Sequence, residues 1–189
     1  MVKRSTFELL KKLPRQEFPR GILLELLEKE GYAYPKDRIS ALLKKEAIVK
    51  VAKNWYVIGP QFRQQSLHLR WLSNIMYTSC LSLQYALWYY NMIPEYPEAF
   101  TAISPLRDFF CVTPVGQFFY TRIPKTAFAM GKTVKTLKDS LGGTERFFIS
   151  TPGKALADLV WKETGLSPST NWEIYLKEDL RIDYASLYQ

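Results

Sequence analysis

The sequence predicts an α+β protein with two parts, and three observations indicate this. Helical apolar patterns fill residues 1–45, strand-like aromatic runs begin at residue 100, and the net charge is confined to the first third. Of the 189 residues, 47% are hydrophobic and 23% are charged, which excludes wholesale disorder. We therefore expect two domains, residues 1–60 and 61–189, with a connecting helix over residues 61–74.

Basic residues are concentrated near the N-terminal end. Residues 1–70 contain 15 Lys or Arg and seven Asp or Glu, whereas residues 71–189 contain 11 of each sign. The whole net charge of +8 therefore lies in the first part of the chain. A uniformly basic surface would indicate little more than solubility. Basic residues concentrated in one domain instead indicate that this domain binds a polyanion.

The N-terminal domain shows three helical patterns followed by a hairpin. The first apolar face stops at Pro14, the second helix begins at Pro19 and ends near Gly31, and the third begins at Pro35. Two β-branched and aromatic runs then flank a turn at residues 53–54. A hairpin after a third helix is the element order of a winged helix-turn-helix. In that fold a helix enters the major groove of DNA and the hairpin reaches the neighbouring backbone.

Eight polar side chains of this domain are the candidate DNA contacts. Arg38 and Ser40 lie on the third helix where base edges could be read, whereas the lysines suit phosphate oxygens. A helix face rich in Lys and Arg is also ordinary for a solvated surface, so each residue alone is a weak signal. The full set is Lys36, Arg38, Ser40, Lys44, Lys45, Lys50, Lys53 and Asn54.

The C-terminal domain begins with an uncharged segment. Residues 71–94 are long enough to span a bilayer, but they include seven polar side chains that would be costly in lipid. We interpret the segment as a buried core and expect no membrane partner. Within it, Ser82 is a predicted helix N-cap.

Aromatic-rich runs predict a small antiparallel sheet in the same domain. A helix should follow from Thr151 and Pro152 to Gly165, and a last polar helix should run over residues 171–179. The predicted strands span residues 100–103, 109–112, 118–121 and 146–149.

Catalytic and metal-binding patterns are missing from the sequence. His68 is the single histidine, and Cys80 and Cys111 are too far apart in sequence for a metal knuckle. Carboxylates such as Asp158 sit on amphipathic helices, where most are solvated. We therefore expect no enzymatic activity, metal or cofactor. Two thiols and the lack of an export signal predict a cytoplasmic protein.

Several motifs occur in a fixed order in the C-terminal domain. They are a serine-led helix, an Ile-Pro-Glu turn, a Thr-Pro-Val-Gly turn, a Ser-Thr-Pro helix start and an acidic-basic final segment. Together they resemble the AbiEi family, the antitoxin and repressor component of type IV toxin–antitoxin (abortive-infection) systems. The motifs span residues 82–87, 92–95, 113–118, 120, 122–124, 128, 150–160 and 175–183.

The resemblance implies an N-terminal domain that binds operator DNA and represses its own operon. It also implies a C-terminal domain that counteracts a nucleotidyltransferase-like toxin without a stable complex. A homodimer on DNA is compatible with these roles. Two alternatives stay open: a stand-alone winged-helix regulator whose C-terminal domain senses a ligand or dimerises, and an enzyme acting on nucleic acid.

Overall fold

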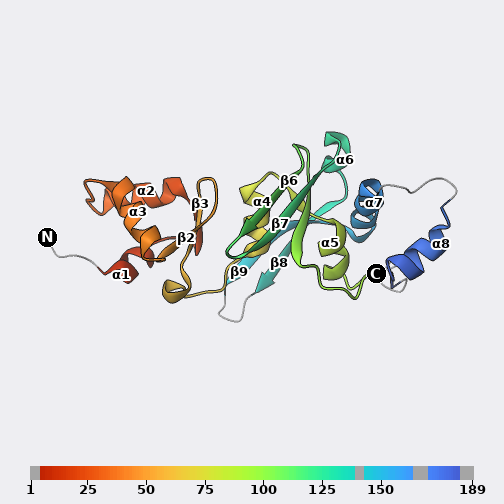
Figure 1. Ribbon diagram of the computed structural model, residues 1–189, viewed down its shortest axis with the longest axis horizontal. Coiled ribbons are helices and arrows are strands. Elements are labelled where there is room, and N and C mark those ends of the chain that lie inside the picture. Colours follow the sequence, from red (N-terminus) through yellow and green to blue (C-terminus); the bar gives the residue numbers. More distant parts are fainter. Residues whose placement is uncertain (1–4, 139–142, 164–169, 184–189) are drawn as a thin grey trace. The chain divides into compact units, whose positions relative to one another are not determined.

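The computed structural model describes residues 5–138, 143–163 and 170–183, and it divides the chain into two units (Figure 1). The N-terminal unit is formed mainly by residues up to Leu69, and the C-terminal unit mainly by residues from Arg70 onward. The predicted boundary at residue 60 precedes this division. Both units combine helices with strands, so the predicted α+β class is confirmed.

The N-terminal unit contains three helices and a three-stranded antiparallel sheet with the order β1-β3-β2. The predicted helices and the β2–β3 hairpin are present. Strand β1, between the first two helices, was not predicted because it has only three residues. The elements are α1 (Thr6–Leu10), β1 (Glu17–Pro19), α2 (Arg20–Lys29), α3 (Pro35–Lys44), β2 (Ile48–Ala52) and β3 (Trp55–Ile58).

The core of this unit lies between its helices and its sheet. Leu23 and Leu27 of α2 are four residues apart and therefore share one helix face, and both are fully buried. Ile39 and Leu42 form the matching stripe on α3, and they join the same cluster as Tyr56 of the central strand β3. The solvent-facing side of α3 is consequently the side opposite Ile39 and Leu42.

The predicted connecting helix over residues 61–74 is wrong. A short 3₁₀ turn, η1 (Pro60–Phe62), is followed by non-helical residues, and helix α4 begins only at Leu69 (Leu69–Met76). The start of α4 is fixed by Glu145, whose carboxylate accepts hydrogen bonds from the backbone N–H groups of Arg70 and Trp71 at 2.8 and 3.1 Å. This cap comes from a distant part of the sequence, so helical periodicity could not locate it.

The C-terminal unit contains a six-stranded sheet with the order β6-β7-β5-β4-β9-β8. The prediction of a small antiparallel sheet is wrong, because β5 pairs with β7, and β4 with β9, in parallel. The β6–β7 hairpin folds so that its second strand, not its first, lies beside β5. The strands are β4 (Cys80–Leu81), β5 (Ala99–Ser104), β6 (Phe109–Thr113), β7 (Gly116–Arg122), β8 (Lys132–Lys138) and β9 (Thr144–Ser150).

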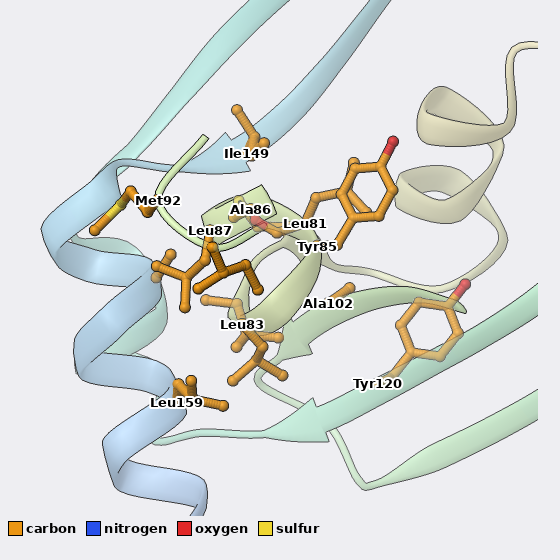
Figure 2. Packing of buried hydrophobic residues seen from close by; sticks show 14 of the residues in the cluster. Leu81, Leu83, Tyr85, Ala86, Leu87, Met92, Ala102, Tyr120, Ile149 and Leu159 are labelled. Carbon is orange, nitrogen blue, oxygen red and sulfur yellow. Dashed lines mark hydrogen bonds between the residues drawn. The ribbon is translucent and has the colours of Figure 1, made fainter. Parts of the chain in front are cut away.

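Helices α5 (Leu83–Tyr89) and α7 (Pro152–Lys162) pack against each other, and α5 also covers β5. Figure 2 shows Leu83 and Leu87 of α5 between Leu159 of α7 and the strands. Residues 71–94 contribute heavily to this buried cluster, as predicted. The remaining helical elements are α6 (Lys125–Ala129), α8 (Trp172–Ile174) and a π-helical turn, η2 (Tyr175–Asp179).

Within the described ranges, no helix has the length and apolar character that a membrane crossing requires. The predicted start of α7 at Pro152 is confirmed, whereas its predicted end at Gly165 lies outside the described residues. The predicted final helix over residues 171–179 is present as α8 and η2. Thus most helices and the β2–β3 hairpin were predicted, and the pairing of the strands in the six-stranded sheet was not.

Candidate nucleic-acid interface

The exposed side of α3 carries three of the predicted contact residues. Lys36, Ser40 and Lys44 follow one another at four-residue spacing, so they form one row along the helix, and all three are exposed. The Ser40 hydroxyl donates a hydrogen bond to the Lys36 carbonyl oxygen at 3.2 Å. This bond leaves the lone pairs of the Ser40 oxygen available to accept a hydrogen bond from a partner.

The β2–β3 hairpin carries three further predicted residues. Lys50 lies on β2, and Lys53 and Asn54 form the turn, all of them exposed. Asn54 has a φ of 66°, in the left-handed region that asparagine tolerates well. Its carbonyl oxygen accepts a hydrogen bond from the backbone N–H of Arg20 at 2.7 Å, so the hairpin tip is tied to the start of α2.

Five exposed lysines on α3, directly after it and on the hairpin have no carboxylate partner among the residues that the structure describes. By contrast, Lys12 in the same unit forms an ion pair with Glu30 at 2.6 Å. The charges of the five are therefore not neutralised within the described part of the chain, which suits them to phosphate groups. These lysines are Lys36, Lys44, Lys45, Lys50 and Lys53.

Arg38 lies apart from this row of lysines. Its side chain is half-buried, and its guanidinium donates to the Thr6 hydroxyl oxygen at 3.4 Å. The guanidinium carbon is also 5.3 Å from the centre of the Tyr32 ring, a cation–π distance. Arg38 therefore links α3 to α1 and to Tyr32 in the loop after α2, and it is not presented on the same face as Lys36 and Lys44.

One of the two aromatic residues of the hairpin, Tyr56, belongs to the core of the unit. Tyr56 is 6% exposed and its ring stacks on Phe18 with a centroid distance of 6.3 Å. Trp55 is half-buried. Tyr56 shares a buried cluster with Ile39 and Leu42, on the side of α3 that faces the core. Its ring is therefore not available to stack on a base.

Arg20 was not among the predicted contact residues. It is the first residue of α2, and its backbone N–H holds the hairpin tip through Asn54. Its half-buried side chain therefore starts close to the turn that carries Lys53. The signal in the sequence was its position directly after Pro19, at a predicted helix start, where backbone N–H groups also favour anions.

A buried polar network in the C-terminal unit joins Ser82, Lys154 and Asp158. The Ser82 hydroxyl donates to one carboxylate oxygen of Asp158 at 2.6 Å, and the Lys154 ammonium forms an ion pair with the other. Asp158 is 3% exposed, so the expectation that it is solvated is wrong. Ser82 occupies the predicted N-cap position of α5, but its hydroxyl binds Asp158 and does not cap the helix.

This network is suited to structure rather than to chemistry. Ser82 is fully buried, and the nearby Cys80 is fully buried too, which raises the pKa of its thiol to about 12. A thiol with that pKa stays protonated near neutral pH and is a poor nucleophile. No group of three or more His, Cys, Asp or Glu residues in the described part of the chain is arranged to hold a metal ion.

The exposed basic row and hairpin of the N-terminal unit thus form the candidate interface. Comparison with protein-family models finds no model that matches the chain, and comparison with curated proteins finds no matching sequence.

Proposed function

We propose that the N-terminal unit is a winged helix-turn-helix that binds duplex DNA. In this proposal α3 enters the major groove and the β2–β3 hairpin contacts the neighbouring phosphate backbone. The observation that carries the proposal is the set of five exposed lysines without a carboxylate partner in the described part of the chain. They are divided between α3 and the hairpin, the two elements that this mode of binding uses.

The order of the elements supports the same proposal. Strand β1 between α1 and α2 pairs with β3, and the hairpin follows α3 directly. The side of α3 that carries Ile39 and Leu42 is buried, so the row with Ser40 faces outward. An outward helix row and an adjacent basic hairpin can contact a groove and its backbone together.

Within this proposal the side chains have different roles. Lys44, Lys45, Lys50 and Lys53 neutralise phosphates, while Ser40 is the candidate for a contact to a base edge. Arg38 is a positioning residue, because its guanidinium is engaged with Thr6 and Tyr32.

We further propose that the chain is a repressor and antitoxin of a type IV system that acts in the cytoplasm and is not an enzyme. This rests on the resemblance of the C-terminal motifs to the AbiEi family. Ser82 and Asp158 come from two of these motifs and share a hydrogen bond, which gives the two motifs a common structural reason to occur together. The proposed functional partner is a nucleotidyltransferase-like toxin, counteracted without a stable complex.

The DNA-binding proposal is tested by measuring the affinity of the full chain for its own promoter duplex at several salt concentrations. Affinity should fall steeply with salt, because lysine–phosphate contacts release counterions. A Lys44→Ala/Lys45→Ala variant should bind weakly to every sequence, and its log–log salt slope should be smaller by about 2.

Matched variants separate charge from position. Lys125→Ala/Lys138→Ala removes the same charge from exposed residues beyond the basic third of the chain, and it should bind as the wild type does. Arg38→Ala should weaken binding to specific and unrelated duplexes alike, together with a lower melting temperature. Binding that is insensitive to salt, or equal losses in both lysine variants, would contradict the proposed interface.

A further inference from the structure

Among the residues that the structure describes, strand β6 is an edge strand of the six-stranded sheet, and its own residues lack the usual protection of an edge. Its five residues, Phe109–Thr113, include no charge and no proline. The opposite edge strand, β8, carries Lys132, Lys135 and Lys138. Natural proteins place lysines on edge strands to prevent pairing with other chains. The contrast indicates that β8 is protected from such pairing and β6 is not.

The β6 edge is also surrounded by exposed apolar side chains. Phe110 is 48% exposed, Val112 65% and Trp161 of α7 66%. The ring of Phe110 stacks on that of Phe119 at 4.2 Å, and a groove of about 570 Å³ runs over them. The groove is also lined by Asp108, Arg122 and Lys162, and apolar side chains rimmed by charged ones are typical of interaction surfaces.

The hairpin geometry shows which backbone groups face outward. A two-residue turn, Pro114 and Val115, joins β6 to β7, and the ring contacts place Phe110 opposite Phe119. In such a hairpin alternate residues bond to the partner strand, beginning with the pair that flanks the turn. Phe110 and Val112 therefore direct their backbone N–H and C=O groups away from β7, toward the edge.

We propose that two copies of the chain associate by antiparallel pairing of β6 with β6 of a second copy. The pairing is centred on Cys111, so that Phe110 of each copy lies opposite Val112 of the other. The Cys111 pair then lies on the two-fold axis, and every other contact occurs twice. The two sheets become one continuous sheet, and aromatic rings face β-branched side chains, a favourable cross-strand combination.

The amount of surface fits a second copy as the occupant. A free aromatic side chain offers about 150–250 Å². The exposed fractions of Phe109, Phe110, Val112, Phe119 and Trp161 thus correspond to roughly 500 Å² of apolar surface per copy. Complete burial of these side chains in both copies would cover about 1,000 Å², which with the paired backbone reaches the lower range of specific interfaces. This inference does not rest on DNA binding.

The test is the mass of the full chain in solution by light scattering over a range of concentrations. The wild type should have twice the mass of one chain, whereas Val112→Lys should be monomeric with a dissociation constant raised at least tenfold. The matched control is Val134→Lys, since Val134 is an exposed apolar residue (44%) on the opposite edge strand β8. The control should remain dimeric, and melting curves should show that both variants fold.

Cross-linking tests the register. Directly opposed residues at the centre of the pairing have Cα atoms about 4.5 Å apart, within the range for a disulfide. Oxidised glutathione, which takes up the two electrons and two protons from the thiols, should link Cys111 to Cys111 of the second copy. Cys80→Ser should still form this link and Cys111→Ser should not.

Three results would overturn the proposal. They are a monomeric wild type at every concentration, a Val134→Lys variant that dissociates as Val112→Lys does, and a dimer that forms no link through Cys111.

Discussion

At the scale of single residues, Asp158 shows how a buried charge is accommodated in the C-terminal unit. Both of its carboxylate oxygens are used, one by Ser82 and one by Lys154, and the side chains of Asp158 and Lys154 are 4% and 12% exposed. The sequence places Lys154 four residues before Asp158. It could not show that Ser82, 76 residues away, closes over the pair and removes it from water.

Removing one partner of this pair should be costly. Lys154→Met leaves the carboxylate of Asp158 buried without its counter-charge, and it should lower the free energy of unfolding by about 3–5 kcal/mol. Ser82→Ala should cost about 1–3 kcal/mol, because it removes one hydrogen bond to the same carboxylate. Urea unfolding followed by circular dichroism measures both losses.

The control is the pair formed by Lys177 and Glu173, which has the same four-residue spacing but is exposed. Lys177→Met should leave the midpoint of unfolding almost unchanged, since solvent already screens that pair. If Lys154→Met and Lys177→Met have equally small effects, the buried pair does not stabilise the fold as argued.

At the scale of elements, the predictions that succeeded rest on local pattern and those that failed rest on distant partners. Helices α2 and α3 could be predicted because helical periodicity is a pattern within a few residues. The apolar residues that form this pattern are Leu23 and Leu27 in α2, and Ile39 and Leu42 in α3. The parallel pairing of β5 with β7, and the capping of α4 by Glu145, join segments that no local pattern connects. Strands such as β1 and β4 are too short to show a period-two pattern, so they can be recognised only from the strand with which they pair.

Strand β1 contains a buried carboxylate that links it to the segment before α4. Glu17 is 1% exposed, accepts a hydrogen bond from the backbone N–H of His68, and pairs in the sheet with Val57. Burial raises the pKa of the Glu17 carboxyl above 4.5, although the His68 contact and the charge of Arg15 oppose this shift. The folded chain therefore binds a proton at Glu17 more readily than the unfolded chain does.

The sign of the pH dependence follows from that difference. The contribution of Glu17 to stability is fully present below pH 4.5 and is lost as the pH rises through its folded pKa. Glu17→Gln should therefore gain stability relative to the wild type between pH 4.5 and neutral pH, measured by urea unfolding at each pH. Glu25→Gln, at an exposed position on α2, is the control for the loss of one carboxylate from the same unit. If the free energies of unfolding of Glu17→Gln and the wild type differ by the same amount at every pH, the pKa of Glu17 is not raised in the folded chain.

At the scale of the whole molecule, the two units divide the charge and the candidate functions. The N-terminal unit holds the exposed lysines of the candidate interface, and the C-terminal unit holds the buried Ser82–Asp158 network, the β6 edge and the motifs that resemble the antitoxin family. The numbers of basic and acidic residues in the two parts of the sequence were enough to predict this division of charge. The row formed by Lys36, Ser40 and Lys44, and the separate position of Arg38, required the structure.

This division predicts that repression and toxin protection can be lost separately. In the full chain, Lys44→Ala/Lys45→Ala should abolish repression of a promoter reporter, because the phosphate contacts of α3 are lost. Under the proposed function, the same variant should still rescue cells that express a nucleotidyltransferase-like toxin counteracted by the wild type, because nothing in the C-terminal unit has changed. Reporter output and cell survival are measured for the same strains, with Lys125→Ala/Lys138→Ala as the charge-matched control that keeps both activities. If a folded Lys44→Ala/Lys45→Ala protein loses rescue together with repression, protection depends on DNA binding and the proposed division of function between the two units is wrong.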